Sequence, residues 1–95
     1  MATYVILSRV SPKSFNDPDE FRKVARKVGE KIRSECPGIV WKGSYGLFGR
    51  FDVLDIVEAQ DPKDVARAAG IIRAYGHAST ETMPAVVWDE FLESI

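Results

Sequence analysis

Twice in this sequence an apolar run of strand length is followed by an Asp-Pro dipeptide and then by an amphipathic segment, and this repeat restricts the fold more than any other feature. Aspartate caps the unbonded N–H groups of a helix's first turn and proline fits the first helical position, so Asp17-Pro18 and Asp61-Pro62 each predict a helix start. The β-branched runs at residues 3–10 and 51–58 predict strands. The repeat therefore indicates two halves of similar plan.

The remaining segments complete these halves. Apolar residues follow Asp17-Pro18 at helical spacing, and Pro37-Gly38 ends this first helix because the residue before a proline is disfavoured in the helical region. Residues 39–48 predict a strand, which a tight turn at Gly49-Arg50 joins to the strand at 51–58. Gly76 ends the second helix, residues 77–87 predict a fourth strand, and residues 88–95 predict a short tail helix with one apolar side.

This β-α-β-β-α-β order with a tail helix predicts a ferredoxin-like α+β fold, in a single domain of residues 1–95. Because crossovers between strands are right-handed, the four strands should form one antiparallel sheet with both long helices on the same face. Gly43 and Gly46 weaken the second strand and indicate a bulge there.

The other face of this sheet has no helix to cover it, although the strands are apolar on both faces. In the third strand, Val53 lies on one face and Leu54 and Ile56 lie on the other. A large apolar patch rarely stays exposed on a monomer. We therefore expect a homodimer, in which a second copy covers the open face to form a dimeric α+β barrel, with Trp41 or Tyr45 near the seam. A different partner protein or the side chains of the tail helix are the alternative covers.

Composition argues against several classes of function. The chain has 13 basic and 14 acidic residues and a net charge of -1, whereas nucleic-acid binding needs clustered, uncompensated positive charge. No apolar run approaches the ~20 residues of a membrane span, the start lacks the basic residues of a signal peptide, and a single cysteine fits a reducing cytoplasm. One cysteine and one histidine cannot form a usual zinc site, so we expect no metal and no cofactor.

The basic residues of the first helix are expected to form a solvated surface rather than a binding site for nucleic acid. They are Arg22, Lys23, Arg26, Lys27, Lys31 and Arg33.

Asp55 is the most informative polar residue, because it interrupts the most strand-like segment on the face of Val53 and Val57. A buried carboxylate without a partner is costly, so Asp55 needs a cation, hydrogen-bond donors or solvent. Pairing with Arg9 or Lys42 on a neighbouring strand is one interpretation. A carboxylate facing a pocket inside the barrel is the other.

A small-molecule site is expected on the uncovered sheet face, where an apolar lining carries a few polar groups. Thr80 and Thr82 share one face of the last strand, where they are either strand formers or hydroxyls lining a cleft. His77, after the helix stop, is either a general base or a residue that interacts with the last carbonyls of the helix. Asp52 is expected to bond backbone, and Cys36 to be a buried thiol. The candidate ligand-binding residues are Tyr4, Tyr45, Asp55, Thr80, Thr82, Arg9 and His77, and no residue is assigned a catalytic role.

The hairpin and the second half resemble the GYD-domain family of small bacterial and archaeal proteins. The centre of the match runs from Tyr45 to Val53, where the family shows an aromatic strand followed by Gly-x-Tyr-Asp; here Phe51 replaces the tyrosine, so any role of that hydroxyl is absent. Residues 1–10 and 45–86 carry the resemblance, including Glu58-Ala59 and Thr80-Glu81-Thr82. It implies the dimeric α+β barrel class, and the family's biochemical activity is not established.

These observations favour a cytoplasmic small-molecule-binding or interaction module. One alternative is a cofactor-free enzyme, because the barrel class also contains monooxygenases and muconolactone isomerases; His77, Asp55 or a tyrosine would then act in catalysis. A second alternative is an effector-sensing or oligomerisation domain, since the class includes effector-binding domains of leucine-responsive regulators. A shared fold alone does not decide among them.

Overall fold

The order of elements is the predicted one, and the computed structural model describes the whole chain, residues 1–95. The longest connection, residues 11–17, joins the first strand to the first helix. The elements are β1 (Ala2–Val10), α1 (Pro18–Glu35), β2 (Val40–Gly46), β3 (Val53–Ala59), α2 (Pro62–Gly76), β4 (Ala78–Ala85) and α3 (Trp88–Ser94).

Both Asp-Pro dipeptides begin helices, as predicted. The Asp17 side chain accepts a hydrogen bond of 2.9 Å from the backbone N–H of Glu20. The Asp61 side chain accepts one of 2.9 Å from the backbone N–H of Lys63. Caps of this kind stabilise a helix by about 1 kcal/mol each. The end of α2 differs slightly from the prediction, because Gly76 is still helical and His77 takes the left-handed conformation, with φ 53°.

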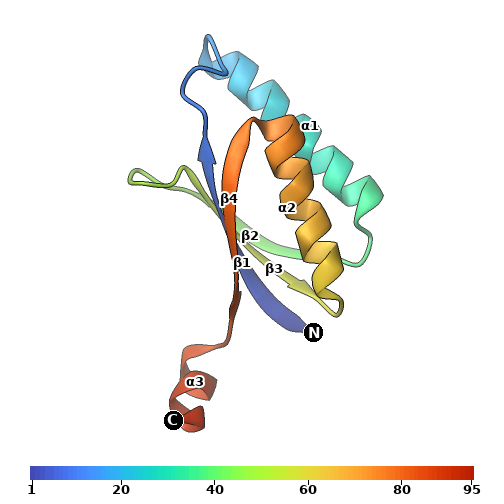
Figure 1. Cartoon of the computed structure of the whole chain (residues 1–95), viewed down its shortest axis with the longest axis vertical. Helices are drawn as coiled ribbons and strands as arrows, with labels where there is room; N and C mark the ends of the chain where they lie inside the picture. Colours follow the sequence, from blue (N-terminus) through green and yellow to red (C-terminus); the bar gives the residue numbers. More distant parts are fainter.

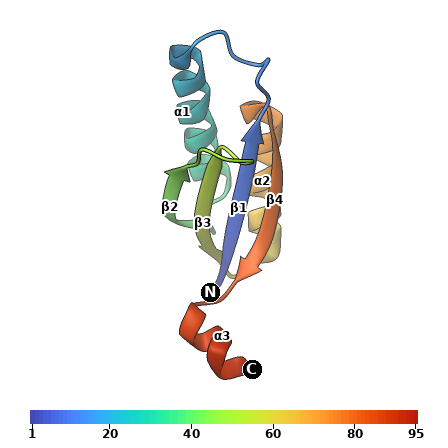
Figure 2. The ribbon, with the colours of Figure 1, turned by 90° about the vertical axis from the view of Figure 1, so that its left-hand side faces the viewer.

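The four strands form one antiparallel sheet in the order β2-β3-β1-β4, and α1 and α2 both lie on one of its faces (Figures 1 and 2). The predicted ferredoxin-like α+β fold with a short C-terminal helix is confirmed. No helix of the chain is long and apolar enough to cross a membrane.

The predicted bulge lies in β2, where the register against β3 shifts between Trp41 and Gly43. Because of this shift, Trp41 and Ser44 both lie on the helix-covered face, opposite Val57 and Asp55. Tyr45 lies on the open face. The bulge thus separates the two residues that were expected near a dimer seam: Tyr45 lies on the open face, and Trp41 lies on the face that the helices cover.

The core lies between α2 and the sheet. The β1 and β3 side chains that point toward the helices, such as Ile6 and Val57, are fully buried. The backbone of α2 packs closely on β1, β3 and β4, because its alanines at positions 68 and 69 are small. The backbone of α1 packs on α2 and approaches no strand closely. This difference leaves space between α1 and the sheet.

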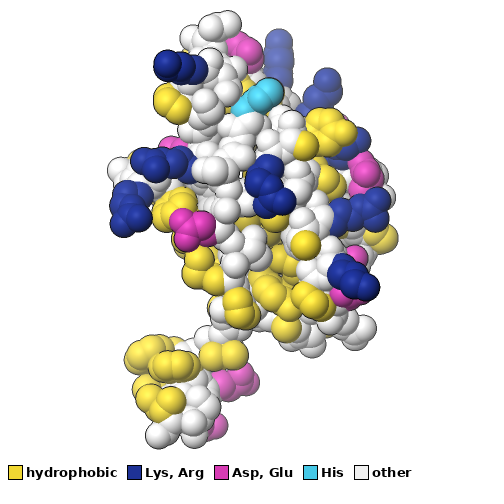
Figure 3. Space-filling model, in the orientation of Figure 1, with side chains coloured by type: hydrophobic (Ala, Val, Ile, Leu, Met, Phe, Trp, Pro, Cys, Tyr) yellow, Lys and Arg dark blue, Asp and Glu magenta, His cyan; other side chains and the backbone are white.

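The tail helix α3 extends away from the rest of the molecule and packs against no other helix or strand (Figures 1 and 2). Its apolar side chains gather on the surface of this projecting end (Figure 3). They are exposed, and comprise Trp88, Phe91, Leu92 and Ile95.

Candidate functional site

A cavity of about 550 Å³ lies between α1 and the sheet. The apolar side of α1 forms one wall, with Phe21, Val24 and Val28 lining the space, while only Ile32 of the helical stripe is buried. The opposite wall is the helix-covered face of the sheet. The space that a closely packed α1 would fill is therefore a pocket of the size that holds small organic molecules.

A chain of hydrogen bonds crosses the sheet wall of this pocket. The indole Nε1–H of Trp41 donates to Ser44 Oγ over 2.8 Å, and Ser44 Oγ donates to Asp55 Oδ1 over 2.6 Å. An indole nitrogen can only donate, so the single proton of the Ser44 hydroxyl is directed to the carboxyl group of Asp55. The bulge in β2 creates this arrangement, since it places Trp41 and Ser44 on the same face.

Asp55 lies on the floor of the pocket with a side chain that is almost entirely buried, at 5% exposure. Burial raises the pKa of this carboxyl above its ordinary value, and the hydrogen bonds from Ser44 and Trp41 oppose part of that increase. No basic side chain forms an ion pair with Asp55, since the two salt bridges of the chain, Arg22–Asp19 and Lys31–Glu35, both lie on α1.

Ser8 adds a second polar group to the same floor. Its side chain is 3% exposed, and its Oγ atom has no hydrogen-bond partner within the protein. Ser8 is paired with Val53 and Ile6 with Asp55, so Ser8 and Asp55 are diagonal neighbours on adjacent strands. Such neighbours lie roughly 7 Å apart. One bound group can thus reach both.

The rest of the lining is mainly apolar. Phe15 and Phe21 form an edge-to-face pair with ring centroids 5.3 Å apart, and both contribute to the lining together with Trp41. Arg33 is the one basic residue of the lining, and it is exposed. Cys36 is buried, as predicted, and its burial raises the pKa of the thiol, so it is not a reactive thiolate.

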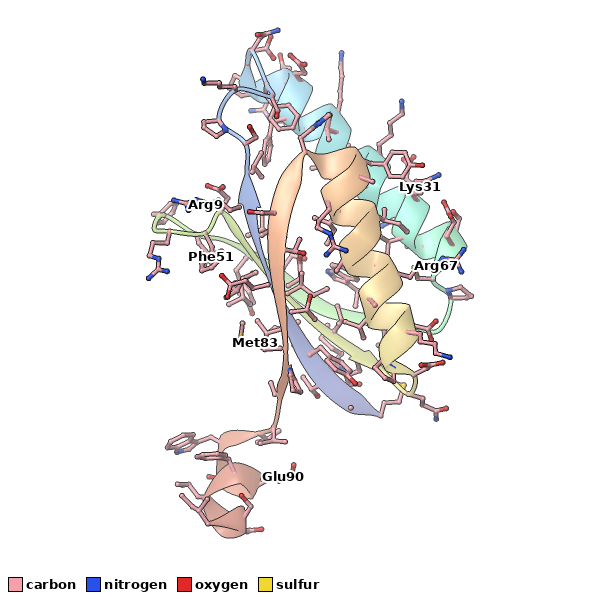
Figure 4. All side chains as sticks on the ribbon, viewed as in Figure 1. Arg9, Lys31, Phe51, Arg67, Met83 and Glu90 are labelled. Atoms are coloured by element: carbon pink, nitrogen blue, oxygen red, sulfur yellow. The ribbon has the colours of Figure 1, made fainter.

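The structure places Asp55 in a pocket, but not on the predicted face. Asp55 lies under the helices, whereas the site was expected on the uncovered face. Alternation along a strand defines two faces without showing which of them the helices cover. Of the two interpretations of Asp55, the ion pair with Arg9 or Lys42 is not observed, and the pocket carboxylate is. Arg9 lies on the side of the sheet away from the helices (Figure 4), and the bulge brings Ser44, not Lys42, opposite Asp55.

The other candidate residues do not gather around Asp55. Tyr4 packs against the core, and Thr80 accepts a 2.9 Å hydrogen bond from Arg73 Nη1 of α2. Thr82 is exposed on the edge strand, and Tyr45 lies on the open face of β2. By register, Tyr4, Thr80 and Thr82 share the helix-covered face with Asp55, whereas Tyr45 lies on the open face, and of all these residues only Asp55 lines the cavity.

His77 lies outside the lining of the pocket. It is exposed, its ring meets that of Phe15 edge-on at 5.8 Å between centroids, and its backbone carbonyl accepts a 2.9 Å hydrogen bond from the N–H of Ser11. These contacts join the end of α2 to the loop after β1, which is a structural role.

Two expectations about other polar residues are confirmed. Asp52 Oδ2 accepts a 2.7 Å hydrogen bond from the backbone N–H of Val10. The basic side chains of α1 are mostly exposed, and Lys31 lies on the outer side of the helices (Figure 4). No group of three or more His, Cys, Asp or Glu side chains is arranged to hold a metal ion.

Sequence reasoning missed Ser8, Ser44 and the role of Trp41. Ser44 and Trp41 are three positions apart, which strict alternation assigns to opposite faces. Gly43 gave the signal for a bulge, and counting one extra residue there would have placed Ser44 beside Asp55. Ser8 follows Ile6 on the same face of its strand, so a small polar residue in a buried position was visible.

The four-stranded antiparallel sheet with two helices on one face defines the class of this molecule as a ferredoxin-like α+β protein, here with a pocket between α1 and the sheet. Within that class, the chain belongs to the GYD-domain family, whose model matches residues 4–95.

Solved structures of other proteins share this fold. FFRP-DM1 is 27% identical with a TM-score of 0.55, over 90% of this chain and 100% of that one. Hypothetical protein PHS023 from Pyrococcus horikoshii is 27% identical with a TM-score of 0.56, over 92% of each chain. A "putative antibiotic biosynthesis monooxygenase" from Caulobacter crescentus is 17% identical with a TM-score of 0.52, over 90% of this chain and 92% of that one, and shows the fold alone. No curated protein matches the sequence.

Proposed function

We propose that this protein is a binding module for a small, largely apolar molecule, which enters the cavity between α1 and the sheet. The observation that carries the proposal is a cavity of about 550 Å³ with two buried polar side chains, Ser8 and Asp55, on an otherwise apolar lining. Ligand sites of globular proteins have this composition: apolar walls supply affinity, and a few polar groups fix the orientation of the ligand.

The stability of the protein gives a second argument for a binding role. An apolar residue at position 55 would pack without cost, whereas the buried carboxyl and the unpartnered hydroxyl of Ser8 both cost free energy of folding. Groups that reduce stability in this way are typical of functional sites. A ligand that bonds to both would remove the cost.

The experiment that tests this function uses a larger side chain on α1 to fill the cavity. Ala25 lines the pocket, so Ala25→Phe should place a ring inside it, while Ala66→Phe on the exposed side of α2 is the matched control. Small aromatic probes should shift the amide and indole NMR signals of Trp41 and Ser44 in the parent and in Ala66→Phe. Binding that persists unchanged in Ala25→Phe would contradict the proposal.

We also propose that the protein is a homodimer through the open sheet face. That face carries Val5, Leu7, Leu54 and Ile56 without a covering element, and Met83 projects from it (Figure 4). The apolar side of α3 is likewise unpartnered in its own chain. Packing the two open faces together would cover the sheet and give α3 of each copy a surface on the other.

The lone buried Cys36 fits the cytoplasmic location we propose for the dimer.

One observation favours a second candidate function, a cofactor-free enzyme. Asp55 is a carboxyl with a raised pKa in a pocket, and such groups serve as general acids or bases. His77 and the tyrosines do not line the cavity, so Asp55 is the one candidate for this role. Mass spectrometry of a ligand incubated with the protein distinguishes the two functions: an enzyme converts the ligand and loses this activity in Asp55→Asn, whereas a binding module returns it unchanged.

A further inference from the structure

The inference that follows rests on the proposed binding function and concerns the chemical class of the ligand. Asp55 presents an acidic group to the cavity for which the protein supplies no counter-charge. Ser44 bonds to Oδ1 and the nearby Trp41 indole also favours the charged carboxylate, but both of these groups are neutral, so no cation of the chain is paired with Asp55. Burial of an unpaired carboxylate is costly, and a bound cation would remove that cost more completely than a neutral donor.

Ser8 supplies a second acceptor at the same place. Its buried Oγ has no partner, and its position on β1 is diagonal to that of Asp55 on β3. A hydroxyl oxygen accepts two hydrogen bonds. An ammonium group carries up to three N–H donors, so it can donate to Asp55 Oδ2 and to Ser8 Oγ together. A ligand hydroxyl has a single proton to donate, so it can bond to both only by accepting from the Ser8 hydroxyl, and it brings no charge to Asp55.

The walls of the cavity suit the rest of such a ligand. Phe15, Phe21 and Trp41 contribute aromatic surface, which packs against rings and attracts cations at its faces. Arg33 is the only cation of the lining; it is exposed and forms no ion pair with Asp55. The floor of the cavity is therefore acidic, and its walls are aromatic and aliphatic.

From these observations we propose that the cavity binds an organic amine: a protonated primary or secondary amino group on an apolar body with one or two rings. The nitrogen lies between Asp55 and Ser8, and the ring body lies against α1.

Three probes of similar size and different charge test this class. They are 2-phenylethylamine, 2-phenylethanol and phenylacetate, each titrated at pH 7 and followed by the NMR shifts of the Trp41 indole N–H and the amides of Ser8 and Asp55. The amine should bind at least about tenfold more tightly than the alcohol, since a charge-assisted hydrogen bond is the stronger one, and phenylacetate should bind most weakly.

Asp55→Asn should reduce amine affinity about tenfold and leave the alcohol within about twofold, because the amide keeps the acceptor for Ser44 but removes the charge. Glu30→Gln, which removes the same charge from the exposed surface of α1, is the matched control and should change neither. A carboxyl ¹³C titration of the parent protein adds a test that needs no variant: the amine should lower the apparent pKa of Asp55, and the alcohol should not.

The possible failures are distinguishable. Equal binding of amine and alcohol, a preference for phenylacetate, or amine selectivity that survives Asp55→Asn would overturn the ligand class and leave the binding function standing. If none of the three probes perturbs the signals of the cavity at millimolar concentration, both the ligand class and the proposed function fail.

Discussion

At the scale of single residues, the hydrogen-bond chain from Trp41 through Ser44 to Asp55 determines the chemistry of the cavity floor. Ser44 accepts from an indole that can only donate, so its proton is committed to Asp55. Asp55 can then offer Oδ2 to a ligand while Oδ1 stays bonded. The three residues act as one unit, and a change in any of them should appear in the titration of the carboxyl.

Ser44→Ala tests that unit. Loss of the hydroxyl should raise the pKa of Asp55 further, because the bond from Ser44 opposes the effect of burial. It should also reduce the free energy of unfolding by about 1 kcal/mol. The carboxyl ¹³C titration and urea denaturation measure the two effects. Ser79→Ala, on the exposed edge strand, is the control; an unchanged Asp55 titration in Ser44→Ala would contradict this description.

Asp55→Asn tests the cost of the buried charge. The pKa of Asp55 is higher in the folded protein than in the unfolded chain, where it is about 3.9. Protonation of Asp55 therefore contributes fully to the free energy of unfolding below about pH 3.9, and this contribution is lost as the pH rises through the folded pKa. Asparagine does not ionise, so the variant should be more stable than the parent at pH 7, by on the order of 1 kcal/mol, with the difference vanishing in acid. Thermal unfolding from pH 3 to pH 8 measures this; a variant that is less stable at pH 7 contradicts it.

At the scale of elements, α1 and α3 are the two helices whose apolar sides are not fully used within the chain. The stripe of α1 buries only Ile32 and otherwise faces the cavity, while α3 packs against no other element. We interpret the first as a ligand surface and the second as a surface for the partner subunit. Both interpretations rest on apolar side chains that no other part of the chain covers.

Phe91→Asp tests the role of α3. Since α3 has no partner in its own chain, the charge should leave the circular-dichroism spectrum and the stability of the fold within about 0.5 kcal/mol of the parent, as for a surface substitution. It should weaken the dimer at least tenfold in a dilution series followed by analytical ultracentrifugation. Glu90→Gln on the polar side of α3 is the control, and a dimer that dissociates equally in all three proteins would refute the role.

At the scale of the whole molecule, the ferredoxin-like fold could be predicted because its signals are local. A few neighbouring residues determine each of these signals, which are the helix starts at Asp17 and Asp61 and the β-branched runs. Topology rules then restrict how the elements can be arranged. The site could be predicted only in part. Asp55 is conspicuous in an apolar strand, but the face it occupies depends on where two helices pack, and its partner Ser44 depends on a bulge of one residue.

The size of the cavity is likewise not encoded in any local pattern. The helical spacing of Phe21, Val24 and Val28 is the same whether α1 packs directly on the sheet or stands away from it. The distance is determined by contacts of α1 with α2 rather than with the strands. Tertiary packing therefore decides whether these residues form core or pocket.

Ile56→Glu tests the assembly of the whole molecule. Ile56 lies in the centre of the open sheet face, opposite Val5 and Gly43, so a charge there should be buried in the proposed dimer and exposed in a monomer. Light scattering at micromolar concentration should return twice the chain mass of 10.6 kDa for the parent and for Ala66→Glu on the exposed side of α2. Ile56→Glu should return the monomer mass. A parent protein of monomer mass would contradict the dimer.

The central claim is that the cavity between α1 and the sheet is the ligand site, and intermolecular nuclear Overhauser effects from bound 2-phenylethylamine test it most directly. The claim predicts contacts from the ring protons of the probe to the methyl groups of Val24 and Val28 and to the Trp41 indole. Contacts confined to the open sheet face or to α3 would contradict it.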